Sequence, residues 1–393
     1  MRTPVVLICG QGDTDGVVEV MAEQPGTVVV RHRFDGQVVL RSVRAEGDTS
    51  EWPLELQKGC IACTVRNDLL VLLRRLHRRH DVRRIVVHLM PWLEPEPVCW
   101  AIQNVAVHVG PGYLDGPAAR DVRIEGVVTC IDAVNWLRQA IGDDELDDGR
   151  TVAQVVVGQA EFADALVVTE PHAPSLAMLR RLAPRARLTV GSCRVETALG
   201  HLEPDSRRGR SDTPHDPLLT GEPPLVADGE VGLLVFSARR PFHPQRLHAA
   251  VDLLLDGVVR TRGRLWVANR FDDVMWLESA GGGLRTEYAG KWLAAMSSDQ
   301  LAIVDPQRRA LAAADWNPRF GDRHVSITVL VCGAEPEHIV DGLRGALLTA
   351  DEMANPHEWP TYIDPFGDWH EDPCDELAER AGESTIAVEG EDR

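Results

Sequence analysis

The chain has 393 residues, a formal net charge of −19 at pH 7, 44% hydrophobic residues and 26% charged residues. This length exceeds what one hydrophobic core comfortably serves and predicts two domains. The composition is that of an ordinary globular protein, and no run approaches the roughly 18 apolar residues that a transmembrane helix requires. The negative charge disfavours sequence-independent binding to nucleic acid, which depends on Lys and Arg contacts to phosphates.

The start of the chain, MRTPVVLICGQG, runs directly into a β-like apolar stretch. It lacks the charged, apolar and small-residue zones of a signal peptide, so a cytoplasmic location with no membrane association is expected. Eight cysteines in that compartment are expected to be mostly reduced. Only Cys60 and Cys63 are closely spaced, which points to metal or redox chemistry for that pair and not to a disulfide framework.

The first half of the chain alternates β-rich runs with segments of helical periodicity. Residues 68–79 and 152–163 have the apolar spacing of helices. The pattern predicts an α/β fold with a mostly parallel sheet and helices on both faces. Near-continuous stretches of Val and Ile in several of the β-rich runs predict strands that are buried on both faces of the sheet. The expected strands are 4–9, 27–34, 84–90, 122–131 and 165–170.

A Pro-, Asp-, Gly- and Ser-rich segment from about 202 to 229 interrupts the periodicity and is the predicted linker. A second, smaller α/β unit follows it. Its expected strands are 230–238, 262–270, 274–279 and 323–333, and its expected helices are 244–256 and 337–348. The predicted organisation is a first domain over 1–205, a linker over 206–229, a second domain over 230–375 and an acidic, solvated tail over 376–393.

A glycine-bearing turn between the first strand and its helix stands where a phosphate loop, G-x-x-x-x-G-K-[ST], would lie. Gly10, Gly12 and Gly16 are the candidate nucleotide-binding residues there. Asp15 replaces the second glycine of the motif, Gly16 the lysine and Val17 the hydroxyl that binds magnesium. A carboxylate at about 4 Å from a phosphate charge costs roughly 4 kcal/mol at an effective dielectric of about 20. The turn is therefore interpreted as a tight strand-to-helix connection, with weak nucleotide binding through backbone N–H groups as the alternative.

Cys60 and Cys63 lie in a predicted turn before a helix that is expected to begin near residue 67. Thiolates are favoured at helix N-termini and suit zinc. Tetrahedral zinc sites need four ligands, and Glu55 is the predicted third. The alternatives are two ordinary reduced cysteines or a thiol oxidoreductase pair.

A basic stretch over 74–84 contrasts with the acidic chain. Arg74, Arg75, Arg78 and Arg79 within it could contact RNA phosphates from one helix face. A solvated helix face without a partner is the equally supported alternative.

These residues resemble the CobW family of P-loop GTPases and metal chaperones. Gly59, Cys60, Cys63 and Thr64 match the family's G-C-x-C-C-T zinc motif, with Ala62 at the middle cysteine. The segments 127–133, 240–247, 320–323 and 364–366 match further family motifs. The resemblance implies a P-loop GTPase-like domain followed by a CobW-type C-terminal domain. His88 stands where the family has a Glu on the catalytic side, and residues 169–172 replace the guanine-reading N-K-x-D.

Within the family the chain is most similar to an actinobacterial branch that recruits a ribosome hibernation factor when zinc is scarce. The segments 59–79 and 239–266 carry this similarity. It implies an adaptor that brings the hibernation factor to the small ribosomal subunit. The alternative is a GTP-dependent zinc chaperone. Zinc is the expected ligand in either case, and the replaced motifs predict weak or no GTP binding and hydrolysis and no catalytic residue at the former nucleotide site.

Overall fold

The computed structural model describes residues 2–57, 60–314 and 316–367. Gly59 of the zinc motif and the predicted acidic tail lie outside these residues. In the described part of the chain, no helix is both long and apolar enough to cross a membrane.

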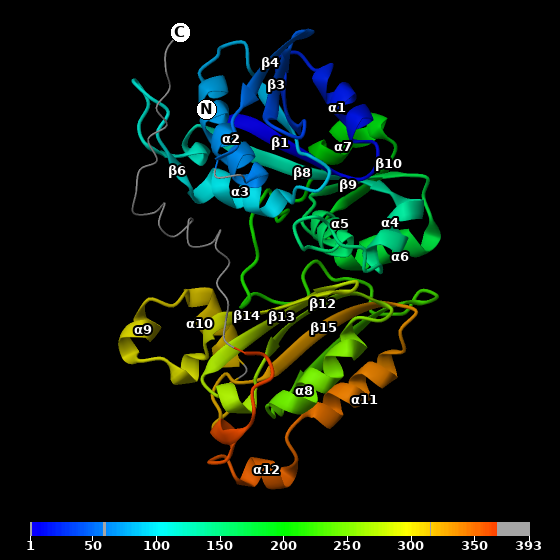
Figure 1. Cartoon of the computed structure of the whole chain (residues 1–393), viewed down its shortest axis with the longest axis vertical. Coiled ribbons are helices and arrows are strands. Elements are labelled where there is room, and N and C mark those ends of the chain that lie inside the picture. Colours follow the sequence, from blue (N-terminus) through cyan, green and yellow to red (C-terminus); the bar gives the residue numbers. More distant parts are fainter. Residues whose placement is uncertain (1, 58–59, 315, 368–393) are drawn as a thin grey trace.

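The first domain is built on an eight-stranded sheet in the order β10-β9-β8-β1-β5-β2-β3-β4 (Figure 1). All neighbouring strands are parallel except the β2–β3 and β3–β4 pairs. The predicted parallel α/β fold is therefore confirmed. The strands are β1 (Thr3–Gly10), β2 (Thr27–Phe34), β3 (Val39–Ala45), β4 (Asp48–Leu54), β5 (Arg84–His88), β8 (Val122–Asp132), β9 (Ala165–Thr169) and β10 (Arg187–Val190), with β6 (Ala106–Val107) and β7 (Gly116–Pro117) in a separate pair.

Side chains alternate between the two faces of a strand, and β1 shows why the sheet is covered on both faces. Val5 and Leu7 pack with α2 and α3, whereas Val6 and Ile8 pack with α1 and α7. All four side chains are fully buried. The helices of this domain are α1 (Thr14–Ala22), α2 (Ile61–His77), α3 (Pro95–Asn104), α4 (Ala133–Ala140), α5 (Val152–Glu161), α6 (Ala173–Leu182) and α7 (Val195–Gly200).

Strands β3 and β4 were not predicted. They form a hairpin on a turn at Glu46 and Gly47, whose φ angles of 49° and 91° suit a two-residue turn with both residues left-handed. Only Val39 and Val43 of the β3 strand are buried, and β4 is exposed along nearly its whole length. An edge strand with so little apolar surface has no hydrophobic pattern to reveal it.

The second domain is a five-stranded sheet in the order β11-β15-β12-β13-β14, in which every neighbouring pair is antiparallel. Val329 and Val331 of β15 face the helices α8 and α11, while Leu330 between them faces the first domain. The strands are β11 (Val231–Ala238), β12 (Val258–Leu265), β13 (Asp273–Ala280), β14 (Gly283–Lys291) and β15 (Val325–Cys332), and the helices are α8 (Pro244–Ala250), α9 (Ser298–Ala302), α10 (Pro306–Ala314), α11 (Pro336–Ala346) and α12 (Ala350–Ala354).

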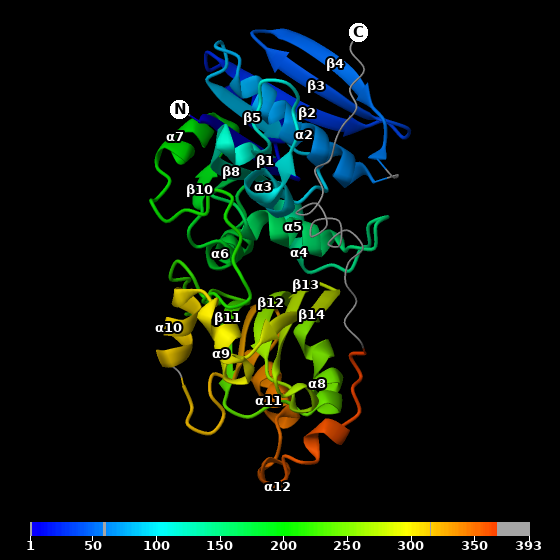
Figure 2. The same cartoon turned by 90° about the vertical axis from the view of Figure 1, so that its left-hand side faces the viewer.

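The two domains share one apolar cluster. Val231, Val259 and Leu330 of the second sheet pack with residues of α4, α5 and α6, and the tip of the β13–β14 hairpin contacts the first domain through a hydrogen bond from Gly282 N to Gly142 O of 3.1 Å. Figures 1 and 2 show these three helices between the two sheets. The contact fixes the walls of the space between the domains.

Candidate functional site

The glycines at the end of β1 are required by packing. Gly10 has φ 111°, and a Cβ on it would lie 2.2 Å from the carbonyl oxygen of Cys130 in β8. A Cβ on Gly12 would lie 2.8 Å from backbone atoms of Ile131. The close approach of this turn to β8 therefore explains both glycines without a phosphate, which favours the interpretation of a tight connection.

The N-terminus of α1 is capped by the chain's own carboxylate. The Asp13 side chain accepts a hydrogen bond of 2.9 Å from the Gly16 backbone N–H. A Cβ on Gly16 would lie 2.1 Å from Asp13 Oδ2, so the carboxylate lies directly over this position. An N–H group that would point at a phosphate in a phosphate loop is already occupied by an anion.

Asp15, at the position of the second motif glycine, is held by a charged partner. Arg31 of β2 forms an ion pair with Asp15, and its Nε donates to His88 Nδ1 over 2.9 Å. Burial and the charge of Arg31 lower the pKa of His88 to about 4, although Asp15 opposes this. His88 is therefore a neutral acceptor at neutral pH. Val17, at the magnesium position, is fully buried in the core.

The residues that replace the family's guanine-reading motif have structural roles. Glu170 adopts φ 46°, and His172 Nδ1 lies 3.1 Å from the Ser175 hydroxyl, which donates to the Ala133 carbonyl. These contacts connect α6 to α4.

The two cysteines lie at the start of α2, which begins at Ile61, earlier than predicted. Cys60 is the N-cap, and its Sγ accepts a hydrogen bond of 3.2 Å from the Cys63 backbone N–H. Both side chains are partly exposed. The Thr64 hydroxyl donates to the Cys60 carbonyl and accepts from the Gln57 N–H, which fixes the loop before the helix. Two soft ligands are thus presented together at a helix N-terminus, where negative charge is favoured.

Glu55 lies in an exposed position between β4 and α2. Over residues 2–57, 60–314 and 316–367, no group of three or more His, Cys, Asp or Glu side chains could hold a metal ion. The structure therefore does not join Glu55 to Cys60 and Cys63 as a three-ligand set.

The prediction that Arg74 contacts RNA is wrong, because Arg74 is buried at 2% exposure. Its guanidinium forms an ion pair of 2.7 Å with Asp121 and donates to the carbonyls of Val107, Leu114 and Gly116. Arg74 thus holds the loop after α3 onto α2.

The other three arginines of the predicted patch are exposed. Arg78 lies over the Tyr113 ring at 4.2 Å and donates to the Gly112 carbonyl. Arg79 is ion-paired with Asp81 at 2.5 Å. Much of the basic character of this stretch is therefore neutralised within the chain itself.

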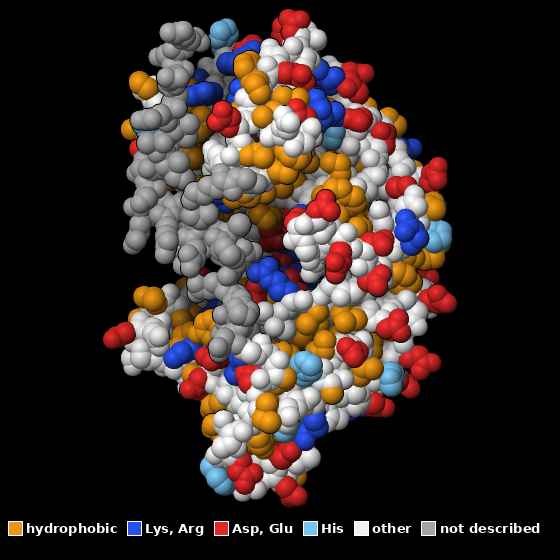
Figure 3. All heavy atoms as spheres, viewed as in Figure 1, with side chains coloured by type: hydrophobic (Ala, Val, Ile, Leu, Met, Phe, Trp, Pro, Cys, Tyr) orange, Lys and Arg blue, Asp and Glu red, His pale blue; other side chains and the backbone are white. Residues whose placement is uncertain are grey.

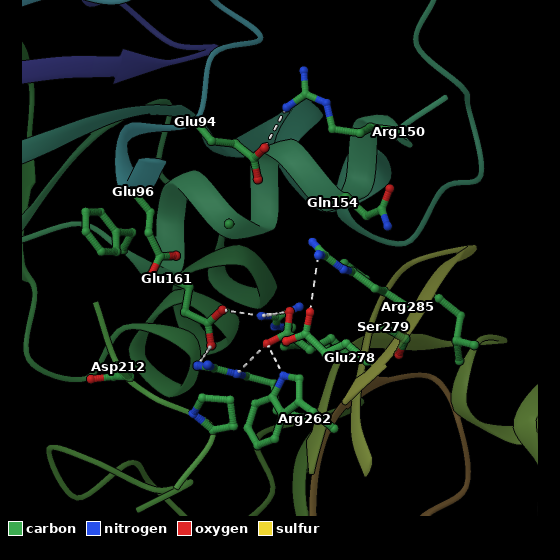
Figure 4. Close-up of a pocket in the computed structure, with 18 of the residues that line it drawn as sticks. Glu94, Glu96, Arg150, Gln154, Glu161, Asp212, Arg262, Glu278, Ser279 and Arg285 are labelled. Atoms are coloured by element: carbon green, nitrogen blue, oxygen red, sulfur yellow. Dashed lines mark hydrogen bonds and ion pairs between the residues drawn. The ribbon is translucent and has the colours of Figure 1, made fainter. Parts of the chain in front are cut away.

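Sequence reasoning did not find a charged cavity of about 640 Å³ between the domains (Figure 4). Glu161 at the end of α5 forms ion pairs with Arg260 and Arg262 of β12, at 2.9 and 3.1 Å. Glu278 of β13 contacts the same two arginines at 3.3 Å. Arginine at every second residue of β12 is the one sequence signal of this site, since it places like charges on one face of a strand.

Comparison with known proteins places these features in a family. Residues 29–185 match the nucleotide-binding domain described as CobW/HypB/UreG, and residues 231–347 match the cobalamin synthesis protein cobW C-terminal domain. A Mycobacterium tuberculosis protein named "Zinc chaperone Rv0106" is 65% identical over 387 residues, which cover 98% of this chain and 97% of that protein. The chain belongs to the CobW family. The match to the family's nucleotide-binding domain begins after the turn at residues 10–17.

More distant similarity extends beyond mycobacteria. The "Zinc-regulated GTPase metalloprotein activator 1" of Dictyostelium discoideum is 23% identical over 367 residues, covering 85% of this chain and 74% of that protein. The crystal structure of the Zn(II)-bound YjiA GTPase from E. coli is 14% identical, covers 88% of this chain and 100% of that chain, and has a TM-score of 0.38.

The nucleotide-binding residues of a CobW-family GTPase do not fit this chain. Asp13 occupies the N-terminus of α1, Asp15 adds a second carboxylate beside it, and Val17 is buried without a hydroxyl. Arg31 offsets the charge of Asp15, but no ammonium group stands at Gly16 to attract a phosphate. Magnesium-bound GTP would meet like charge where the motif supplies attraction.

Proposed function

We propose that this CobW-family protein is a zinc chaperone that carries zinc on Cys60 and Cys63 and does not bind GTP through a phosphate loop. The hydrogen bond from the Cys63 N–H to Cys60 Sγ carries the proposal, because it holds the Cys60 sulfur at the helix N-terminus, in the same first turn that bears Cys63. The 65% identity to a protein named as a zinc chaperone supports it.

An incomplete ligand set suits a cargo that must be released. Two thiolates supply half of a tetrahedral zinc shell, and structural zinc sites are closed by four protein ligands. The partial exposure of both cysteines leaves the remaining positions open to water or to groups of a recipient protein. Cysteine thiols lose their protons when they bind zinc, so the affinity for zinc rises with pH.

Replacement of both cysteines, Cys60→Ser and Cys63→Ser, is expected to weaken zinc binding by more than about a hundredfold, because the soft ligands are lost. Competition between the full chain and a zinc-sensitive chelating dye measures this affinity. Cys193→Ser is the matched control, because Cys193 is exposed and lies outside the pair. An affinity that stays unchanged in the double variant would rule out these cysteines as the zinc ligands.

A second candidate function is recruitment of a ribosome hibernation factor to the small ribosomal subunit in zinc shortage. The turn before α1 favours this function, because Asp13 accepts the hydrogen bond from the N–H group that would otherwise bind a phosphate. A scaffold protein does not need to bind and hydrolyse a nucleotide. Arg75, Arg78 and Arg79 are exposed and would present positive charge to RNA phosphates, although Arg79 would have to leave its ion pair with Asp81.

For the recruitment function, we expect the full chain to co-sediment with ribosomes from zinc-starved cells and to do so less with ribosomes from zinc-replete cells. Charge reversal by Arg75→Glu and Arg79→Glu should reduce this co-sedimentation, because it removes attraction to phosphates. Sedimentation that is equal for both ribosome preparations and for the variant would count against recruitment through this surface.

A further inference from the structure

Residues of both domains line the cavity between them. Figure 3 shows red and blue side chains gathered in a hollow between the two domains. Glu94 and Glu96 enter it from the start of α3, Gln154 and Glu161 from α5, and Arg285 from β14 (Figure 4). Its volume of about 640 Å³ lies within the usual range for small-molecule sites, roughly 300–1,000 Å³.

The cavity wall carries more negative than positive charge. Seven carboxylates and five arginines line it, which leaves an excess of two negative charges. Each of these arginines already has a carboxylate partner within the cavity wall, so an anionic ligand would have to displace an existing ion pair. The pairs are Arg150 with Glu94 and Asp148, Arg207 with Asp212, Arg260 and Arg262 with Glu161 and Glu278, and Arg285 with Glu287.

Among the described residues, Glu96 is the carboxyl group in this wall that forms no ion pair with an arginine. The Glu96 side chain lines the cavity and is exposed to solvent. Burial raises the pKa of Glu96, and the nearby charge of Glu161 adds to this effect, although a hydrogen bond with Ser211 and nearby arginines oppose it. A cation beside Glu96 would relieve both unfavourable contributions.

We propose that this cavity binds a small linear organic polycation of the polyamine class, with one ammonium group against Glu96 and a second toward Glu94, which shares the single guanidinium of Arg150 with Asp148. Ammonium groups donate hydrogen bonds and carry positive charge, which matches the carboxylate oxygens of this wall. Both carboxylates lie at the start of α3, in a cavity that residues of both domains line. This inference is independent of zinc binding at Cys60 and Cys63.

An organic cation fits this wall better than a metal ion does. Throughout the part of the chain that the structure describes, no three His, Cys, Asp or Glu side chains converge as metal ligands. The excess negative charge lies instead on Glu96 and on Glu94 and Asp148, which share one arginine. Separated charges of this kind suit separated ammonium groups on a flexible chain.

Calorimetric titration of the full chain with spermidine at low ionic strength tests the proposal. We expect one saturable site, and we expect Glu96→Gln to weaken binding roughly tenfold, as loss of a hydrogen bond to a charged group does. Glu51→Gln is the matched control, since Glu51 is exposed on β4 and far along the chain from the cavity residues. Glu96→Asp keeps the charge and should retain most of the affinity.

Nonspecific attraction of a polycation to an acidic protein is the rival result. Weak binding of many spermidine molecules per chain, with equal affinity in wild type, Glu96→Gln and Glu51→Gln, would overturn the proposal. A second measurement compares the melting temperature in spermidine and in sodium phosphate at equal ionic strength. Stabilisation by spermidine alone is the expected result, and stabilisation by phosphate alone would assign the cavity to anions and overturn it as well.

Discussion

Replacing Arg74 with Ala is expected to lower the free energy of unfolding by about 3 kcal/mol, the low end of the range for breaking a buried ion pair, because the carboxylate left behind is only partly buried. The orphaned partner is the Asp121 carboxylate, which accepts from Arg74 Nε over 2.7 Å. Three backbone carbonyls, of Val107, Leu114 and Gly116, also lose their donor. Each buried acceptor left without a donor adds roughly 1–3 kcal/mol of desolvation cost, and these costs are not additive.

Denaturation in urea of Arg74→Ala and Arg75→Ala measures this effect. Arg75 is one residue away on the same helix but is exposed, so its replacement should change stability by no more than about 0.5 kcal/mol. Equal, small losses for the two variants would mean that the buried arginine contributes nothing beyond a solvated side chain. The pair of variants thus distinguishes an internal anchor from an RNA-binding surface.

Replacing Glu161 with Gln is expected to cost about 3 kcal/mol at neutral pH, since Arg260 and Arg262 lose the nearer of their two shared carboxylates and keep only Glu278. Burial by itself would raise the pKa of Glu161, but the charges of Arg260, Arg262 and Arg207 outweigh it and lower the pKa to about 2. A carboxyl group with a lowered pKa stabilises the fold fully above its unfolded pKa of about 4.5. That stabilisation is lost as pH falls from about 4.5 toward about 2.

The melting temperature from about pH 6 down to about pH 3 measures this linkage. Wild type should lose stability more steeply than Glu161→Gln over this interval, because the variant no longer has the group that takes up the proton. Glu51→Gln, with an exposed carboxylate, should follow the wild-type slope. Parallel curves for wild type and Glu161→Gln would exclude Glu161 as the source of the acid sensitivity.

The buried strands of the first domain were predictable from sequence, whereas the β3–β4 hairpin at the edge of its sheet was not. The Val- and Ile-rich runs at β1, β2, β5, β8 and β9 have an apolar content that only a buried strand explains. In β4, by contrast, Leu54 is the most buried residue and is only partly covered. Nothing in the hydrophobic pattern marks such a strand, and its pairing comes from the hairpin turn at Glu46 and Gly47.

Part of the candidate site could be predicted from local sequence, and the rest depends on contacts between segments that are far apart in the chain. The C-x-x-C spacing and its position before a helix are local, so Cys60 and Cys63 could be singled out from sequence. Arg74 looked like part of a charged helix face because its partner Asp121 lies 47 residues away. The ion pairs of Glu161 with Arg260 and Arg262 join residues about a hundred positions apart. Contacts at that separation leave no trace in residue periodicity.

Titration of the full chain with magnesium and GTP, with and without zinc, tests the central claim most directly. The claim is that Asp13 and Asp15 occupy the place where a family GTPase holds its phosphates. We expect no binding at micromolar concentrations and no release of phosphate in either condition. Micromolar binding accompanied by turnover would contradict the claim and would make this protein a GTP-driven member of the CobW family.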